Sequence, residues 1–159
     1  MSSRDILLVR HAHAESPTPG QDDAARALSA TGIDEAKAAS AWLQQHDAKP
    51  DRVLCSPAVR AKSTCDLIAA ALGSAPARED ARIYEATPAT LLRILDENAD
   101  ARCLMLVGHN PGLEALVALL SEGTSDSGRG MPPGAVAWLT IPHGDIEPGT
   151  AQVRHFWWP

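Results

Sequence analysis

The sequence predicts an α/β protein in which a mostly parallel sheet lies between two layers of helices. Short apolar runs alternate along the chain with longer segments of helical periodicity, and this order is typical of parallel strands joined by helical crossovers. The run at 103–107 is apolar throughout, as in strands that are buried on both faces of a sheet. We therefore expect a three-layer α/β/α sandwich, formed by residues 1–159 as a single domain.

The first half of the chain is expected to contribute strands at 6–9, 52–55 and 81–84. Its helices are predicted at 31–45 and 58–72, where apolar residues recur along one stripe. Ser29 or Thr31 can cap the first of these helices through a side-chain hydroxyl. Gly73 is placed to end the second in a left-handed conformation.

The second half of the chain is expected to contribute helices at 88–97 and 111–120 and strands at 103–107, 135–141 and 151–158. Pro111 opens its helix because proline is favoured in a first helical turn. The last two strands are joined by a turn that contains proline and glycine, so we expect them to form an antiparallel edge. The segment 123–134 is predicted to be a solvated loop.

Composition limits the classes of partner and the compartment. The net charge of −6 argues against a general binder of nucleic acid or of anionic membranes, since both require a positive surface. The three cysteines, Cys55, Cys65 and Cys103, form no C-x-x-C pair and are odd in number, which is typical of a reducing compartment. The first residues lack the apolar core of a signal peptide, and no apolar run approaches a membrane span. We expect a cytoplasmic protein with no nucleic-acid or membrane partner.

Polar signatures follow three of the predicted strands at the point where each strand ends. They are Arg10-His11, Ser56-Pro57 with Arg60, and Gly108-His109-Asn110-Pro111. In parallel α/β sheets, ligands bind in the crevice beyond the carboxyl ends of the strands. We therefore expect these segments, although far apart in the chain, to meet around one ligand.

The residue types in these signatures favour a phosphate ligand. Arg10 and Arg60 offer forked donors that suit a tetrahedral oxyanion. Arg60 lies in the first turn of its predicted helix, where free backbone N–H groups also attract anions. His11 and His109 add ring nitrogens that can act as nucleophiles or carry protons.

The three signatures resemble those of the histidine phosphatase superfamily, whose fold is phosphoglycerate mutase-like. The matching stretches are LVRHA at 8–12, SPAVRAKST at 56–64 and VGHNPG at 107–112. The R-H-A and G-H-N-P-G forms and the short chain are most similar to the SixA-type phosphohistidine phosphatases. The resemblance is collinear over nearly the whole chain.

The resemblance implies a role for each residue of the signatures. His11 would attack phosphorus and form a phosphohistidine intermediate that water then hydrolyses. Arg10, Arg60 and His109 would bind the phosphoryl oxygens, with no metal ion or other cofactor. Many relatives use a glutamate as proton donor, and Glu85 is the candidate here. The substrate would be a phosphohistidine on a signalling or phosphotransfer protein, since a short chain leaves little sequence for a lid.

Two positions depart from the family's pattern. Ala12 stands where most of the superfamily has glycine, which is acceptable only if the backbone there need not adopt a positive φ. Pro133 stands where a small hydroxyl residue is expected.

Three alternatives remain open. The first is a phosphatase of small phosphate esters on the same scaffold. The second is a metal-dependent hydrolase, in which His11, His13 and His109, with Asp22 or Asp23, would bind the ion. The third is a phosphate-binding module without catalytic activity.

Overall fold

The computed structural model describes residues 2–126 and 130–159 and contains a mixed sheet of six strands in the order β3-β2-β4-β1-β5-β6. The strands are β1 (Ser3–Arg10), β2 (Arg52–Cys55), β3 (Arg78–Glu79), β4 (Cys103–Gly108), β5 (Val136–Pro142) and β6 (Gln152–Trp157). The first four of these pair in parallel, whereas β5 runs antiparallel to both β1 and β6. The predicted parallel sheet with an antiparallel edge is confirmed.

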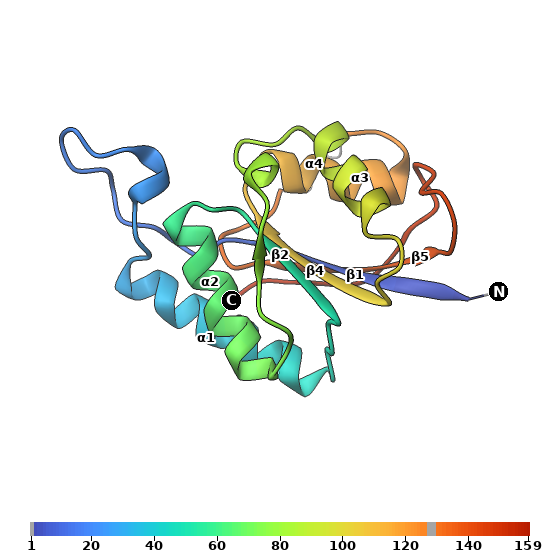
Figure 1. Ribbon diagram of the computed structural model, residues 1–159, viewed down its shortest axis with the longest axis horizontal. Coiled ribbons are helices and arrows are strands. Elements are labelled where there is room, and N and C mark those ends of the chain that lie inside the picture. Colours follow the sequence, from blue (N-terminus) through green and yellow to red (C-terminus); the bar gives the residue numbers. More distant parts are fainter. Residues whose placement is uncertain (1, 127–129) are drawn as a thin grey trace.

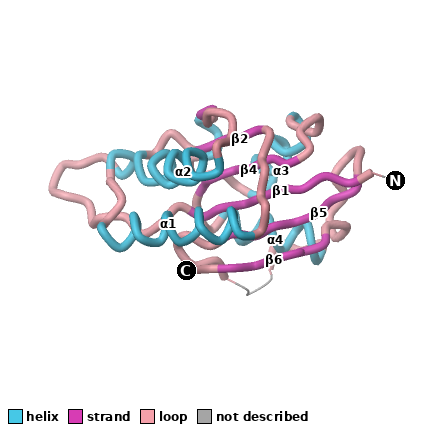
Figure 2. Tube along the Cα trace, turned by 90° about the horizontal axis from the view of Figure 1, so that it is seen from below, coloured by secondary structure: helices cyan, strands magenta, loops and turns pink. Residues whose placement is uncertain are grey.

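Helices cover both faces of the sheet, as the predicted sandwich requires. They are α1 (Ala30–Gln45), α2 (Val59–Leu72), α3 (Pro88–Glu97) and α4 (Gly112–Glu122). Figure 1 shows α1 and α2 on one side of the strands and α3 and α4 on the other, and Figure 2 shows the strands in their order behind α1 and α2. No helix among the described residues has the length and apolar character to traverse a lipid bilayer.

Strand β1 divides the hydrophobic core into two layers because successive side chains of a strand point to opposite faces. Ile6 and Leu8 belong to the cluster formed with α3 and α4, and Leu7 and Val9 belong to the cluster formed with α1 and α2. All four side chains are almost completely buried. This burial on both faces explains why the strand is apolar without alternation.

Local signals fix the ends of the helices. The Ser29 hydroxyl caps α1 by accepting from the backbone N–H of Gly32 at 3.0 Å, so Ser29 rather than Thr31 is the cap. Gly73 ends α2 with a φ of 62°, in the left-handed region that glycine tolerates best. Pro111 stands directly before α4, which continues two residues beyond its predicted end.

The predicted strand at 81–84 is wrong. The strand in this part of the sheet is the two-residue β3, and Ala81–Ile83 form a 3-10 helix. The side chain of Asp80 accepts from the backbone N–H of Arg82 at 3.0 Å, which satisfies that donor within a turn rather than in a sheet. Ile83 is the buried residue of this turn and packs into the core, and its apolar side chain suggested a strand.

The segment between β1 and α1 extends away from the sheet and its helices as the blue loop of Figure 1. It carries a short 3-10 helix, Asp23–Ala25. We call residues 15–28 the protruding loop. The predicted loop at 123–134 includes residues 127–129, which lie outside the described residues.

Candidate active site

The three polar signatures converge on one cavity. Its volume is about 620 Å³, and Arg10, His11, Arg60 and His109 all line it. Arg10 is the last residue of β1, and it pairs in register with Gly108 at the end of β4. The backbone N–H of His11 donates to the carbonyl of Gly108 at 3.0 Å, which joins the two signatures directly. The expected convergence is therefore present.

His11 is held as a neutral imidazole with one nitrogen free. Its Nδ1 lies 2.7 Å from the backbone carbonyl of Ala12. Because a carbonyl can only accept, Nδ1 carries the hydrogen and Nε2 of the neutral ring keeps its lone pair. Burial, with the charges of Arg60 and Arg10, lowers the pKa of His11 to about 4. The ring is thus uncharged at neutral pH, as a nucleophile must be.

His109 lies beside His11, with ring centroids 5.0 Å apart and planes inclined by 59°. Its Nε2 is 2.8 Å from the hydroxyl oxygen of Ser56, which in turn accepts from the backbone N–H of Ala58 at 3.2 Å. Burial and the neighbouring His11 and Arg60 lower the pKa of His109 to about 3. Ser56 therefore fixes the orientation of a neutral ring, a role that its place in the signature had not indicated.

Each of the two arginines is anchored by a hydrogen bond to a backbone carbonyl. Arg10 donates through Nη1 to the carbonyl of Met131 at 2.8 Å, and Arg60 donates through Nη1 to the carbonyl of Asp23 at 2.7 Å. In both side chains Nε is buried and has no hydrogen-bond partner among the described residues. A buried donor without an acceptor is costly. Both guanidinium side chains line the cavity, and their positive charge beside two neutral imidazoles suits an oxyanion.

The cavity also has lining residues that were not predicted as site residues, among them Asn110, Tyr84 and Arg26. Asn110 donates to the same Met131 carbonyl as Arg10, at 2.9 Å. Tyr84 and Arg26 also line the cavity. Asn110 could have been inferred from its place in the third signature. Arg26 belongs to a stretch, Arg26-Ala27-Leu28-Ser29, that also resembles the family, but no role had been assigned to it. Tyr84 comes from a turn, where no periodicity marks a residue as functional.

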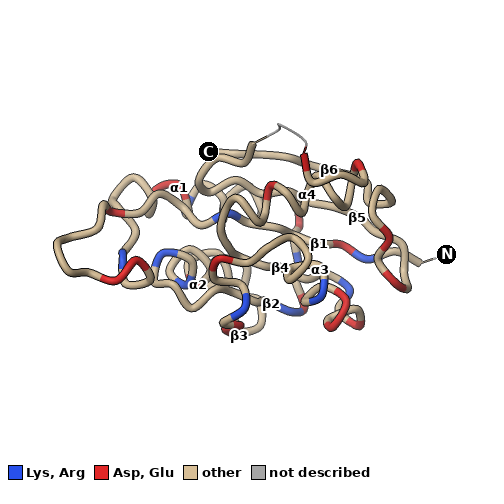
Figure 3. The backbone as a smooth tube through the Cα atoms, turned by 90° about the horizontal axis from the view of Figure 1, so that it is seen from above, with Lys and Arg blue, Asp and Glu red and all other residues tan. Residues whose placement is uncertain are grey.

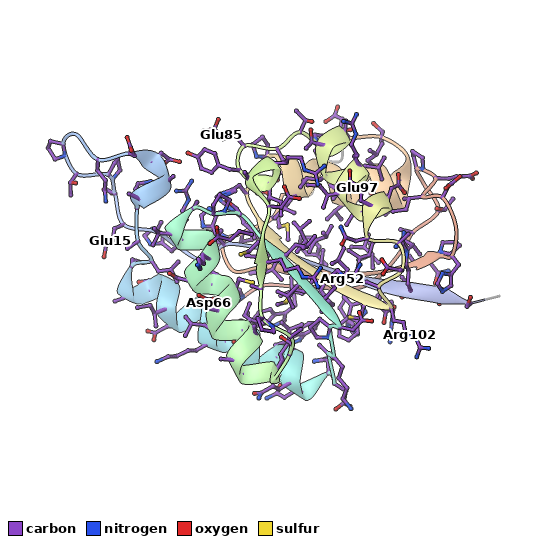
Figure 4. The ribbon with its side chains drawn as sticks, in the orientation of Figure 1. Glu15, Arg52, Asp66, Glu85, Glu97 and Arg102 are labelled. Carbon is purple, nitrogen blue, oxygen red and sulfur yellow. The ribbon has the colours of Figure 1, made fainter. Side chains whose placement is uncertain are left out.

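Glu85 lines the same cavity at its exposed rim. Its backbone adopts a φ of 55°, in the left-handed region that few residues other than glycine occupy. Figure 4 shows Glu85 on the segment before α3, at the outer edge of the molecule. Its place at the rim is compatible with the predicted role as proton donor, and that role stays a prediction.

The two departures from the family's pattern also lie at the site. Ala12 is completely buried and is not among the described residues with positive φ, so its methyl group is accommodated without strain. Its backbone N–H donates to the Thr64 hydroxyl at 3.1 Å, which ties the His11 segment to α2. Pro133 forms part of the cavity wall.

The residues named for the metal alternative do not gather into a set of metal ligands among the described residues. His11, His13 and His109 line the cavity. However, the described part of the chain has no group of three or more His, Cys, Asp or Glu side chains that could hold a metal ion. The Asp23 carboxylate instead forms an ion pair with Arg60 at 2.8 Å. Figure 3 shows acidic positions of the protruding loop beside a basic position at the start of α2.

Comparisons of sequence agree with the geometry. The histidine phosphatase superfamily (branch 1) matches residues 6–91. An uncharacterized protein from Mycobacterium tuberculosis (strain H37Rv) is 34% identical over 158 residues, which cover 93% of this chain and 98% of that protein. An uncharacterized protein from Mycobacterium leprae is 32% identical over 123 residues, 74% of each chain.

Solved structures share the fold over almost the whole chain. A provisionally named phosphohistidine phosphatase SixA from Agrobacterium tumefaciens has a TM-score of 0.86 at 26% identity, and covers 98% of both chains. The protein histidine phosphatase SixA in complex with tungstate has a TM-score of 0.84 at 22% identity, over 97% of this chain and 96% of that one. A mycobacterial glucosyl-3-phosphoglycerate phosphatase has a TM-score of 0.75 at 18% identity, over 96% and 98%.

These likenesses confirm the predicted phosphoglycerate mutase-like fold. The sequence match covers more than half of the chain, and the mycobacterial relative spans nearly all of it. The chain belongs to the histidine phosphatase superfamily.

Proposed function

We propose that this protein is a metal-independent phosphatase that removes phosphate from a phosphohistidine on a protein, with His11 as its nucleophile. The observation that carries the proposal is that the guanidinium side chains of Arg10 and Arg60 line the same cavity as the neutral imidazole of His11. A phosphoryl group bound by these side chains would present its phosphorus to Nε2 of His11.

The proposed reaction has two displacements at phosphorus. Nε2 of His11 forms a bond to phosphorus while the bond from phosphorus to the leaving nitrogen breaks, and the leaving imidazole takes up a proton. Water then attacks the phosphohistidine, and inorganic phosphate leaves as Nε2 regains its lone pair. Arg10, Arg60 and His109 donate to the phosphoryl oxygens, and fixed donors of this kind stabilise the transition state without reorganising.

Glu85 is the proposed proton donor to the leaving group. Its place at the rim is where the part of the substrate beyond phosphorus would lie. The leaving group of a phosphoramidate needs less help from a proton donor than the leaving group of an ester does. We therefore expect the contribution of Glu85 to catalysis to be larger for esters.

A protein substrate is supported by two observations. The SixA-type structures cover this chain almost end to end, including the one described as a protein histidine phosphatase. The cavity is lined by the exposed residues Glu85 and Thr87 before α3 and Pro111 before α4, so a residue on the surface of another protein can approach it. The substrate would then belong to a signalling or phosphotransfer system. The runner-up is a small phosphate ester, because a glucosyl-3-phosphoglycerate phosphatase shares the fold.

The test compares two classes of substrate. The protein is incubated with a histidine-phosphorylated carrier protein and with a panel of phosphate monoesters, in the presence of a chelator, and phosphate release is measured. We expect faster turnover of the carrier, and a loss of at least about a thousandfold in His11→Ala, since covalent catalysis requires the nucleophile. Faster turnover of an ester would overturn the substrate, and loss of activity on chelation would overturn metal independence.

The intermediate offers a separate check. Acid-labile, base-stable phosphate bound to the wild-type protein during turnover, and absent from His11→Ala, is the expected result. Turnover that survives this substitution would contradict the role of His11.

A further inference from the structure

The carboxylate of Asp23 lies at the meeting point of three segments of the chain. Its Oδ1 accepts from Nε of Arg26 at 3.0 Å, on the protruding loop. Its Oδ2 accepts from Nη2 of Arg60 at 2.8 Å, on α2, and from the hydroxyl of Tyr84 at 2.6 Å, in the turn before α3. Each oxygen is therefore engaged by a donor from the walls of the cavity.

Arg60 is held by Asp23 at two points. Besides the carboxylate contact, Nη1 of Arg60 donates to the backbone carbonyl of Asp23 at 2.7 Å. The Arg60 side chain is only 7% exposed, whereas that of Asp23 is 49% exposed. The protruding loop thus places a partly exposed carboxylate against a buried guanidinium. Because the guanidinium is planar and rigid, fixing both Nη atoms fixes the orientation of the whole group.

Asp23 reaches a second phosphate-binding group through Tyr84. The tyrosine ring packs edge-on against His109, with centroids 5.5 Å apart and planes at 87°. The hydrogen bond to Asp23 raises the pKa of Tyr84 to about 12 and holds the pKa of Asp23 well below its usual range, so the phenol remains the donor and the carboxylate remains charged. One side chain on the loop is therefore connected both to Arg60 and to the ring that packs on His109.

From these contacts we propose that Asp23 is a positioning residue, which aligns Arg60 and Tyr84 so that the guanidinium of Arg60 and the ring of His109 are correctly oriented for a phosphoryl group. The inference rests on the proposed function of the same cavity. It makes the protruding loop part of the anion site, although Asp23 itself does not contact the substrate.

The experiment measures the binding of tungstate, an analogue of phosphate. Asp23→Asn keeps the shape of the side chain but removes its charge, and we expect the dissociation constant for tungstate to rise about tenfold or more, because a charged hydrogen-bond partner is lost. The matched control is Glu15→Gln, which removes one negative charge from the same loop. Figure 4 shows Glu15 with its side chain directed away from α2. We expect the control to bind within about twofold of wild type, and both variants are compared by calorimetry and by inhibition of turnover.

Two further measurements separate positioning from a general loss of structure. Asp23→Asn in an Arg60→Ala background should weaken tungstate binding little further, since residues that act as a unit are not additive. Tyr84→Phe removes one hydrogen bond to the Asp23 carboxylate and should weaken tungstate binding about threefold. This variant tests the proposal even if Asp23→Asn fails to fold. A general loss of structure would instead weaken binding equally in both backgrounds and lower the melting temperature in parallel.

The outcomes distinguish the two proposals. Wild-type affinity, or tighter binding, in Asp23→Asn would overturn the positioning role, and tighter binding would show that the carboxylate competes with the anion. Tungstate binding by wild type without turnover of any phosphorylated substrate would overturn the proposed function and still leave the test of Asp23 intact. Failure of the wild-type protein to bind tungstate would overturn both the proposed function and the positioning role of Asp23.

Discussion

The proposed attack of His11 on phosphorus requires an unprotonated Nε2, and the residues around the ring favour that state. Burial and two arginines lower its pKa, and the Ala12 carbonyl fixes the hydrogen on Nδ1. His109 is kept neutral in the same way. The pair therefore provides uncharged rings inside a cavity whose positive charge comes from arginines, which remain protonated at all physiological pH values.

The two depressed histidine pKa values predict how stability depends on pH. An unfolded histidine binds a proton near pH 6.5, whereas folded His11 and His109 do so only near 4 and 3. Between these limits the unfolded state binds more protons, so the free energy of unfolding should fall as pH decreases from about 6.5 to about 4. Urea unfolding at several pH values measures this, and His11→Gln should show a smaller slope. Equal slopes for wild type and variant would contradict the pKa shift.

At the level of single residues, the sequence was sufficient to predict that the four groups named by the resemblance lie around one cavity, and their catalytic roles stay predictions. Arg10, His11, Arg60 and His109 follow predicted strand ends, and parallel strands bring their carboxyl ends together. Asp23 could not be recognised in the same way, because its partners lie 37 and 61 residues away in the chain. A carboxylate in a loop has no pattern that distinguishes it from a solvated charge.

The helices and strands were predictable where apolar periodicity and terminal signals agree. Helix α3 has the predicted bounds, since Thr87 caps it and Pro88 occupies its first turn. The turn at 81–83 was not predicted correctly, since one buried side chain, Ile83, is as compatible with a turn as with a strand. The Asp80 carboxylate accepts a hydrogen bond from the backbone N–H of Arg82 within this turn, and an apolar pattern does not reveal such a bond.

The contact between α1 and the segment after β1 predicts a strict requirement at Gly32. A Cβ at this position would lie 1.9 Å from the carbonyl oxygen of His13, in the backbone that follows His11. Gly32→Ala should therefore destabilise the fold by about 1–3 kcal/mol, as overpacking does elsewhere, and it should also lower turnover by displacing His11.

Urea unfolding and steady-state kinetics check this together. Thr31→Ala, at the exposed neighbouring position, is the control and should change stability by less than about 0.5 kcal/mol. Wild-type stability in Gly32→Ala would show that α1 can shift without cost.

For the molecule as a whole, we expect a ligand bound at the site to raise the free energy of unfolding. Tungstate that binds only the folded protein should raise the free energy of unfolding by about 2.7 kcal/mol at one hundred times its dissociation constant. The same concentration should leave Arg60→Ala almost unchanged, because the buried guanidinium is absent. Thermal unfolding with and without tungstate measures both, and an equal shift in the two proteins would place the anion elsewhere.

The strand order of the sheet has a consequence for biosynthesis. Strand β1 is central, yet its neighbours β4 and β5 begin only at Cys103 and Val136. During synthesis, β1 therefore remains unpaired until most of the polypeptide has emerged from the ribosome. Nascent chains that stall before β4 should be recognised by chaperones or proteases, so premature termination would yield degraded fragments rather than a partly working enzyme.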